Sequence, residues 1–210
     1  MQVSRRTLES LEWPQLALRL AAHARTPGGR RACEPDAAHA LFATHLESAR
    51  AQLAETSEAR ALLDVSAPPF GGMPDVEGAL LRAERGGDLG AGELLDLASV
   101  ATTVDATQHY LARHAAVAPR LAARGGMFAR HAEFAALVSA TLDSEGQVRD
   151  TASPVLAEAR AESRRAHAEL QRRMDAALHD PAIAPHLSDS FVTVRNDRFV
   201  KRTTSKLYNG

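Results

Sequence analysis

The amino-acid sequence predicts a mainly α-helical protein, with a multi-helix core bundle, a long protruding helical arm and a short β segment near the C-terminus. Alanine, the strongest helix former, supplies 42 of the 210 residues. Aromatic residues, which are enriched in strands, make up only 4% of the chain. Apolar residues recur at spacings of three and four in the longer segments, as on the buried face of an amphipathic helix.

The first helices are bounded by proline and glycine. A helix is expected from Pro14, because proline suits the first turn, where its missing N–H would be unpaired anyway. It should stop near residues 26–29, which include Pro27 and two glycines. A second, long helix is expected over residues 36–64, and the proline- and glycine-rich residues 66–74 should form a loop.

Three further helices complete the predicted core. Asp75 is expected to cap the third helix, which ends at a pair of glycines. The fourth helix is expected over residues 92–118 and should be closed by Pro119. The fifth helix is expected over residues 127–142.

The sixth predicted helix, residues 152–179, is the arm, with Ser153 as its cap. At 1.5 Å per residue it should be about 40 Å long. Its apolar stripe is narrow and includes Leu156, Leu170 and Met174, at a spacing typical of a helix that pairs with one partner helix. We therefore expect these three residues to form an arm interface, which at high protein concentration pairs two copies of the chain arm to arm.

The pattern changes again after the arm. Residues 191–195 and 198–200 are rich in β-branched and aromatic residues and flank Asn196 and Asp197, which predicts two strands around a turn. Residues 1–200 contain 22 arginines and no lysine, whereas the last ten residues contain two lysines. Residues 201–210 are therefore either a basic extension or a non-native tail, from a vector or a wrong reading frame, and we favour the non-native origin.

Charge and cysteine content restrict the class of protein. A net charge of −1 creates no overall field that attracts nucleic acid or an anionic membrane. A single cysteine, Cys33, excludes an intramolecular disulfide and suits a reducing compartment. No apolar run approaches the ~18 residues that a membrane span needs. We expect a cytoplasmic protein with no membrane partner.

The sequence contains no recognisable catalytic or metal-binding pattern. No two histidines have the four-residue spacing of a helical zinc site. The paired glycines belong to no phosphate-binding loop and are interpreted as helix stops. We therefore expect no catalytic residue, no metal and no cofactor in this chain, which is not predicted to be an enzyme by itself.

Several segments nevertheless resemble those of one family, in the same order. The first is TLESLEWPQLALRLAAHARTPGGRR (7–31), and LAETSEARALL (53–63) follows it. The next is GGMPDVEGALLRAERGGDLGAGELLDLA (71–98). The last two are SEGQVRDTASPVLAEAR (144–160) and DSFVTVRNDRFV (189–200). Together they resemble the opening part of the bacterial MutS-two proteins, a branch of the MutS family.

The resemblance implies a division of the chain. Residues 1–150 would be the helical core, or lever, residues 151–200 the clamp arm helix with the first clamp strand, and residues 201–210 the tail described above. In this family the arm is covered by a helix that returns from the clamp. Arg195 and Arg198 would lie on the clamp strand, where they are candidates for contact with nucleic-acid phosphates. An equally open interpretation places them on a solvated strand edge.

The resemblance also implies functions for a full-length relative. Such a protein is expected to be a dimeric, ATP- and Mg-dependent ATPase with a C-terminal endonuclease domain. It would act on branched or mismatched DNA, suppressing homologous recombination, or on the rRNA of collided ribosomes. The present chain would be the N-terminal core and start of the clamp, with a structural and clamp role. The alternative is a free-standing helical scaffold that binds protein and has no nucleic-acid role.

Overall fold

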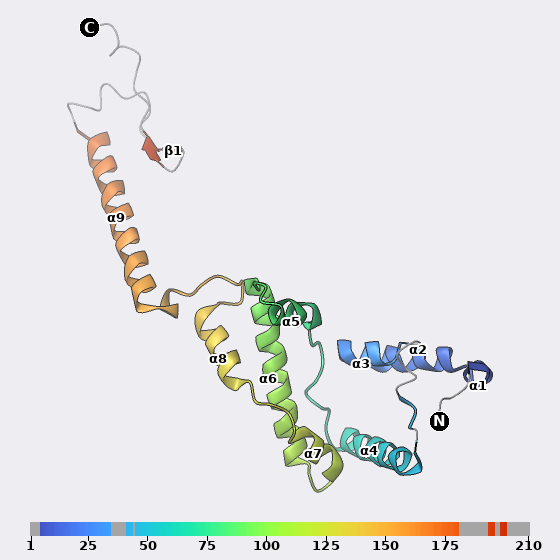
Figure 1. Cartoon of the computed structure of the whole chain (residues 1–210). Helices are drawn as coiled ribbons and strands as arrows, with labels where there is room; N and C mark the ends of the chain where they lie inside the picture. Colours follow the sequence, from blue (N-terminus) through green and yellow to red (C-terminus); the bar gives the residue numbers. More distant parts are fainter. Residues whose placement is uncertain (1–4, 35–40, 44, 181–192, 196–197, 201–210) are drawn as a thin grey trace. The chain divides into compact units, whose positions relative to one another are not determined.

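The computed structural model describes residues 5–34, 41–43, 45–180, 193–195 and 198–200. These residues form nine α-helices and two short strands, which confirms the prediction of a mainly α-helical protein (Figure 1). Contacts divide the chain into two compact units, Met1–Arg149 and Asp150–Gly210, called unit 1 and unit 2 below. Each unit is described by itself.

Unit 1 begins with three helices, α1 (Arg5–Ser10), α2 (Trp13–His23) and α3 (Pro27–Ala32). The prediction that residues 26–29 only end a helix is wrong, because the same residues start α3. The Thr26 side chain accepts a hydrogen bond from the backbone N–H of Gly29 at 3.1 Å, and Pro27 occupies the first turn. A threonine cap followed by proline is a helix start, and here it outweighs the two glycines.

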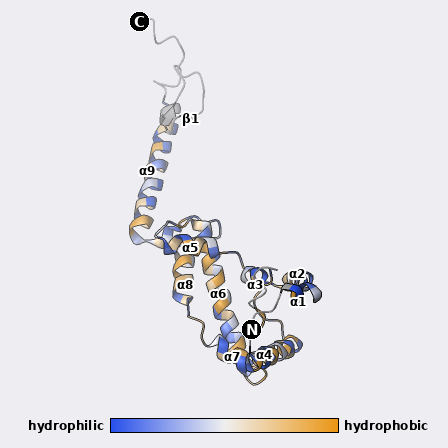
Figure 2. Ribbon diagram, turned by 45° about the vertical axis from the view of Figure 1, so that its right-hand side comes forward, coloured by the Kyte–Doolittle hydropathy of each residue, from blue (hydrophilic) through white to orange (hydrophobic). Residues whose placement is uncertain are grey.

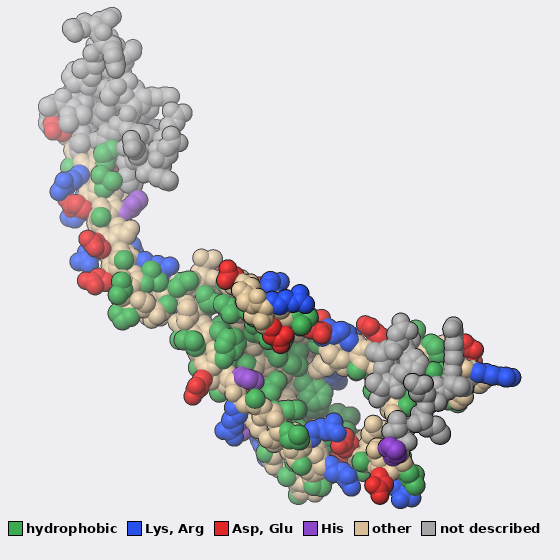
Figure 3. Space-filling model, viewed as in Figure 1, with side chains coloured by type: hydrophobic (Ala, Val, Ile, Leu, Met, Phe, Trp, Pro, Cys, Tyr) green, Lys and Arg blue, Asp and Glu red, His purple; other side chains and the backbone are tan. Residues whose placement is uncertain are grey.

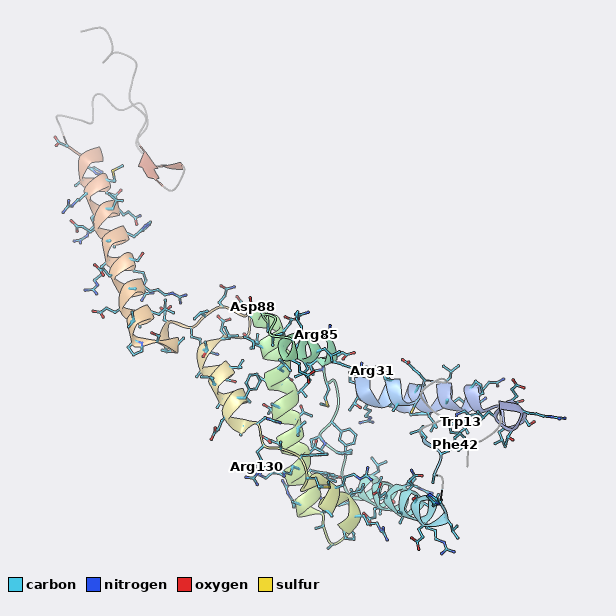
Figure 4. The ribbon with its side chains drawn as sticks, viewed as in Figure 1. Trp13, Arg31, Phe42, Arg85, Asp88 and Arg130 are labelled. Atoms are coloured by element: carbon cyan, nitrogen blue, oxygen red, sulfur yellow. The ribbon has the colours of Figure 1, made fainter. Side chains whose placement is uncertain are left out.

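Helix α4 (Leu46–Val65) is shorter than the predicted helix over residues 36–64. Residues 41–43 are not α-helical, and residues 35–40 and 44 lie outside the described part of the chain. The rings of Phe42 and Trp13 lie 4.4 Å apart between centroids (Figure 4). Phe42 therefore packs against the start of α2 instead of continuing α4.

Helices α5 (Glu77–Glu84) and α6 (Ala91–Arg113) follow the predicted loop. The N-cap residue of α5 is Val76, not the predicted Asp75, although the Asp75 carboxylate accepts a hydrogen bond from the backbone N–H of Glu77 at 3.3 Å. Glu93 in the first turn of α6 accepts the backbone N–H of Gly90 at 2.9 Å and also pairs with Arg82 of α5. This carboxylate therefore joins the end of α5 to the start of α6.

The predicted fourth helix, residues 92–118, ends early at Arg113, and Pro119, predicted only to close it, begins a further helix, α7 (Pro119–Gly125). Glu58 of α4 binds the first turn of α7: its Oε2 accepts the backbone N–H groups of Arg120 and Leu121, each at 3.0 Å. These are donors that a helix start leaves unpaired. A residue more than 60 positions earlier thus supplies the cap, which explains why local sequence did not reveal α7.

The core of unit 1 lies in two clusters. Helix α8 (Ala132–Thr141) packs on α6, and small residues on both helices allow close approach. The members of this cluster are Ala98, Ala101, Ala135, Val138 and Leu142. A second cluster joins α4, α6 and the segment before α7, through Leu62, Tyr110 and Ala118. Figure 2 shows hydrophobic residues along α6 and α8.

Unit 1 ends in a tight turn. The Asp143 side chain accepts the backbone N–H groups of Glu145 and Gln147, at 2.9 and 2.8 Å. Gly146 has a φ of +77°, a conformation that favours glycine. The turn brings Leu142 and Val148 together as an isolated antiparallel bridge.

Unit 2 contains a 3₁₀ turn, η2 (Asp150–Ala152), the arm helix α9 (Pro154–Leu178) and strands β1 (Thr193–Arg195) and β2 (Arg198–Val200). The strands are antiparallel partners. The predicted arm helix and the predicted pair of β segments are therefore both present.

Candidate functional site

The arm helix α9 starts where its local sequence predicts. The Ser153 side chain accepts a hydrogen bond from the backbone N–H of Leu156 at 3.4 Å, and Pro154 fills the first helical position. The main packing partner of α9 within unit 2 is the 3₁₀ turn η2. Figure 1 shows the 25-residue helix as a straight element.

Asp150 binds two arginines of the arm. Its Oδ1 lies 2.5 Å from Nη1 of Arg160 and its Oδ2 lies 2.9 Å from Nη1 of Arg164. Hydrogen bonds from Arg160 and then Arg164 hold the pKa of the Asp150 carboxyl below its ordinary value. The charge of Asp150 is therefore shared between two successive turns of α9, and it fixes η2 to the helix.

Glu169 forms a similar cluster nearer the end of α9. Its carboxylate accepts a hydrogen bond from Nε of Arg173 at 2.7 Å and also pairs with Arg172. The hydrogen bond from Arg173, together with the positive charge of Arg172, lowers the pKa of Glu169. Four of the five arginines on α9 thus have a carboxylate partner, whereas Arg165 donates to the backbone carbonyl of Ala161.

The predicted arm interface lies on α9. Leu156 and Met174 are half-buried and Leu170 is 45% exposed. We call these three residues the arm stripe. Because they are spaced by multiples of a helical turn, they lie along one side of the helix.

The predicted nucleic-acid contacts, Arg195 and Arg198, lie on β1 and β2. They are direct partners in the antiparallel register, as are Val194 with Phe199 and Thr193 with Val200. The structure thus brings the two arginine positions together across the strand pair.

Unit 1 contains a cavity of about 810 Å³ that sequence patterns did not predict. Its walls come from the end of α2, α4, the loop before α5, α6 and α7. Most of the lining side chains are apolar: Ala59, Leu62, Leu63, Pro68, Phe70, Met73, Val104, Leu111, Leu121 and Phe128. We call this space the core cavity. No short-range signal marks it, because its walls come from residues as far apart in the sequence as His23 and Phe128.

An ion-pair cluster ties α3 to the segment that leads into α5. Arg31, which is labelled in Figure 4, contacts Asp75 at 2.5 Å and Glu77 at 2.7 Å. The hydrogen bond from Arg31 lowers the pKa of Asp75, and the Glu77 backbone N–H acts in the same direction. The cluster therefore helps to position α3 beside the core cavity.

The described residues lack two further features. No helix among them is both long enough and apolar enough to cross a membrane. They also contain no group of three or more histidine, cysteine or acidic side chains arranged to hold a metal ion.

Comparison with known proteins identifies a family by sequence, although no family model matches the chain. Endonuclease MutS2 of Anaeromyxobacter sp. (strain Fw109-5) is 37% identical over 197 residues, and its counterpart in Symbiobacterium thermophilum is 36% identical over 196. Each match covers 93% of this chain and 24% of the relative. The putative endonuclease MutS2 of Bacillus subtilis (strain 168) is 26% identical over 205 residues.

The chain therefore spans about a quarter of the length of the curated relatives that it matches. The similarity extends over both units, including the arm helix, because it covers more than nine-tenths of the chain. On this sequence similarity, the chain belongs to the MutS2 family, in the region that these relatives share with it.

Proposed function

We propose that this chain is the core and arm segment of a MutS2 protein that acts on DNA, and that it contacts the DNA backbone through the strand pair that follows the arm. The observation that supports this most directly is the register of β1 and β2, in which Arg195 and Arg198 are partners. Two arginines at one register position suit contact with neighbouring phosphates, which positions a protein on DNA without reading its sequence.

The ion pairs of the arm support the same assignment. Arg160, Arg164, Arg172 and Arg173 are each occupied by Asp150 or Glu169. Arginines that already have carboxylate partners contribute less to phosphate binding than unpaired ones, because DNA would have to displace the carboxylates. The arm then acts as a support, and the strand pair makes the contact.

ATP binding, Mg binding and strand cleavage are proposed only for a full-length relative. We infer that ATP and Mg bind, and that strand cleavage occurs, in the three quarters of those proteins that have no counterpart in this chain. Suppression of recombination, binding to the rRNA of collided ribosomes and formation of the physiological homodimer are proposals of the same kind. Within them, this chain has a structural and positioning role.

DNA binding by the chain itself tests the proposal. Fluorescence anisotropy with a labelled four-way junction should show weak, salt-dependent binding, with a dissociation constant above the nanomolar range at ~150 mM salt. The Arg195→Ala/Arg198→Ala double variant should bind more weakly and lower the slope of log K against log salt by roughly two. The Arg172→Ala/Arg173→Ala variant is the matched control and should bind as the wild type does.

Three outcomes separate the alternatives. Equal binding by the wild type and the Arg195→Ala/Arg198→Ala variant contradicts the proposed contact. No binding to the junction, even at 50 mM salt, favours the protein-binding scaffold. Binding to purified ribosomes with no binding to the junction identifies RNA as the target instead of DNA.

A further inference from the structure

The core cavity has the size of a site for a small molecule. Its volume of about 810 Å³ lies within the ~300–1,000 Å³ that ligand pockets in proteins occupy. The cavity also reaches the surface, because Leu63 and Phe128 line it and are 60% and 40% exposed. Figure 3 shows further hydrophobic side chains on the outside of unit 1, over the α6–α8 region. A molecule that enters from solvent therefore meets an apolar wall.

The hydroxyl groups that line the cavity are already engaged. Thr103 and Thr107 donate to backbone carbonyls one turn earlier, at 2.9 and 2.7 Å, and Tyr110 donates to the carbonyl of Ser66 at 2.8 Å. The hydroxyl of Thr26 caps α3. A sugar or a nucleobase would bury polar edges against this wall without partners for them, which is costly. An alkyl chain has no such edges, so the interior favours it.

The mouth of the cavity carries positive charge. Among the described residues that line the cavity, Arg25 and Arg124 are the only ones with a formal charge, and His23 lines it too. Arg124 binds Glu55 at 2.9 Å, whereas Arg25 is exposed and forms no ion pair with another described residue. An otherwise apolar cavity is thus bordered by a cation that has no carboxylate partner there. This combination suits a molecule with an apolar body and one anionic end.

We propose that the core cavity binds a long-chain amphiphilic anion, of which a free fatty acid is the simplest. The alkyl chain occupies the apolar interior, where its removal from water supplies most of the affinity. The carboxylate stays at the exposed mouth, where it keeps part of its hydration and pairs with Arg25. The site lies in unit 1, away from the strand pair in sequence, and goes beyond the proposed contact with DNA.

A series of chain lengths tests whether the interior takes the alkyl chain. Isothermal titration calorimetry of the full chain with octanoate, decanoate and dodecanoate, all well below micelle-forming concentrations, should show one site per chain. Each added methylene should raise the affinity about fourfold, so successive members of the series should differ by about fifteenfold. An affinity that does not depend on chain length, or no saturable binding of dodecanoate, overturns the proposal.

The head group is tested with dodecyltrimethylammonium, which has the same chain length and the opposite charge. It should bind the wild type more weakly than dodecanoate does. Arg25→Gln should weaken dodecanoate binding by about two- to fivefold, the effect of losing an exposed ion pair. Arg25→Glu should in addition favour dodecyltrimethylammonium. The matched control is Arg60→Gln, since Arg60 is exposed on α4 and does not line the cavity. Equal losses in Arg25→Gln and Arg60→Gln, or equal affinity of the wild type for both head groups, contradict the role of Arg25.

The location of the site is tested by filling it. Ala59 of α4 lines the cavity and is half-buried, so Ala59→Phe should reduce the space and weaken dodecanoate binding at least tenfold. Circular dichroism reports whether this variant is folded. Dodecanoate should raise the melting temperature of the wild type, because it binds the folded state, and should raise that of Ala59→Phe much less. A folded Ala59→Phe variant with unchanged affinity places the ligand elsewhere and overturns the proposal. If Ala59→Phe does not fold, the Arg25 variants and the chain-length series decide.

A phospholipid in a bilayer offers the same chemistry, an alkyl chain with an anionic head. Co-sedimentation with phosphatidylglycerol vesicles separates the two sources. We expect the wild type to stay in the supernatant, because the cavity takes a single chain free of its bilayer. Sedimentation with the vesicles, without binding of monomeric dodecanoate, identifies a bilayer surface as the target and overturns the proposal. None of these measurements contains DNA, so the outcome is independent of the proposed function.

Discussion

Glu58 on α4 caps α7 from outside that helix, with its Oε2 3.0 Å from the backbone nitrogen of Leu121. The same oxygen accepts the N–H of Arg120, and the Glu58 side chain is only 14% exposed. One carboxylate thus replaces the local cap that the sequence before Pro119 lacks, and it ties α4 to α7. The arrangement makes the stability of unit 1 depend on this one side chain.

Replacing Glu58 with alanine should therefore destabilise unit 1 by about 1–2 kcal/mol, the usual cost of losing a helix cap with a charged acceptor. Urea denaturation followed by circular dichroism measures this difference. Glu58→Gln keeps an acceptor oxygen, so this variant should lose less stability than Glu58→Ala. If Glu58→Ala unfolds at the same urea concentration as the wild type, the cap does not contribute.

Gly146→Ala should also destabilise the chain, by roughly 1–2 kcal/mol, because an alanine at a φ of +77° adopts a left-handed conformation. Its Cβ would in addition lie 3.2 Å from Cβ of Ala91. Thermal unfolding of this variant is best compared with Gly78→Ala. Gly78 lies in α5 with open space around it, and alanine there should stabilise by about 0.5 kcal/mol. Equal melting temperatures for the two variants would contradict the conformational argument.

The pairing of Asp150 with two arginines predicts a pH dependence. Because the folded pKa of Asp150 is lowered, its contribution to stability is present above the unfolded pKa of about 3.9 and is lost as pH falls through the folded value. The attachment of η2 to α9 should therefore persist at neutral pH and weaken only in acid, below about pH 4. Carboxyl-carbon NMR titration should give a pKa for Asp150 below the usual range.

Arg160→Gln provides the matched variant for that titration. Arg160 makes the largest contribution to the lowered pKa, so its loss should move the pKa of Asp150 back toward the ordinary value. Arg165→Gln should leave the pKa of Asp150 unchanged, because Arg165 donates to a backbone carbonyl instead. An Asp150 that titrates normally in the wild type would show that the two ion pairs are absent in solution.

The chain should not bind ATP tightly, because its sequence contains no glycine-rich loop with the lysine that cradles phosphates. Isothermal titration calorimetry with ATP and Mg tests this expectation. Submicromolar binding by the pure chain would contradict the assignment of nucleotide chemistry to other parts of a full-length relative.

Sequence patterns predicted the elements whose signals are local. Ser153 and Pro154 lie next to each other and mark the start of α9. The β-branched and aromatic residues of 191–195 and 198–200 predicted the two strands. Thr26 and Pro27 carried an equally local signal for α3, but the glycines after them led to the wrong interpretation. The short range of these interactions is the reason that they can be recognised at all.

Features made by distant residues could not be predicted in this way. The cap on α7 depends on Glu58, and the core cavity depends on residues from His23 to Phe128. The pairing of Arg160 and Arg164 with Asp150 spans 10 and 14 positions, so the spacing of the arginines on the helix did not reveal it. Such contacts arise only after the helices have packed.

Two adjacent residues form bonds in opposite directions along the chain. Arg149 binds back, through its backbone N–H to Thr141 and through its guanidinium Nε to the carbonyl of Leu142, both at 2.8 Å. Asp150 binds forward, to the arginines of α9. A cut in the chain between these two residues would break one peptide bond and none of these contacts. The boundary between the two units is therefore a single peptide bond, with the anchoring contacts of each unit on its own side.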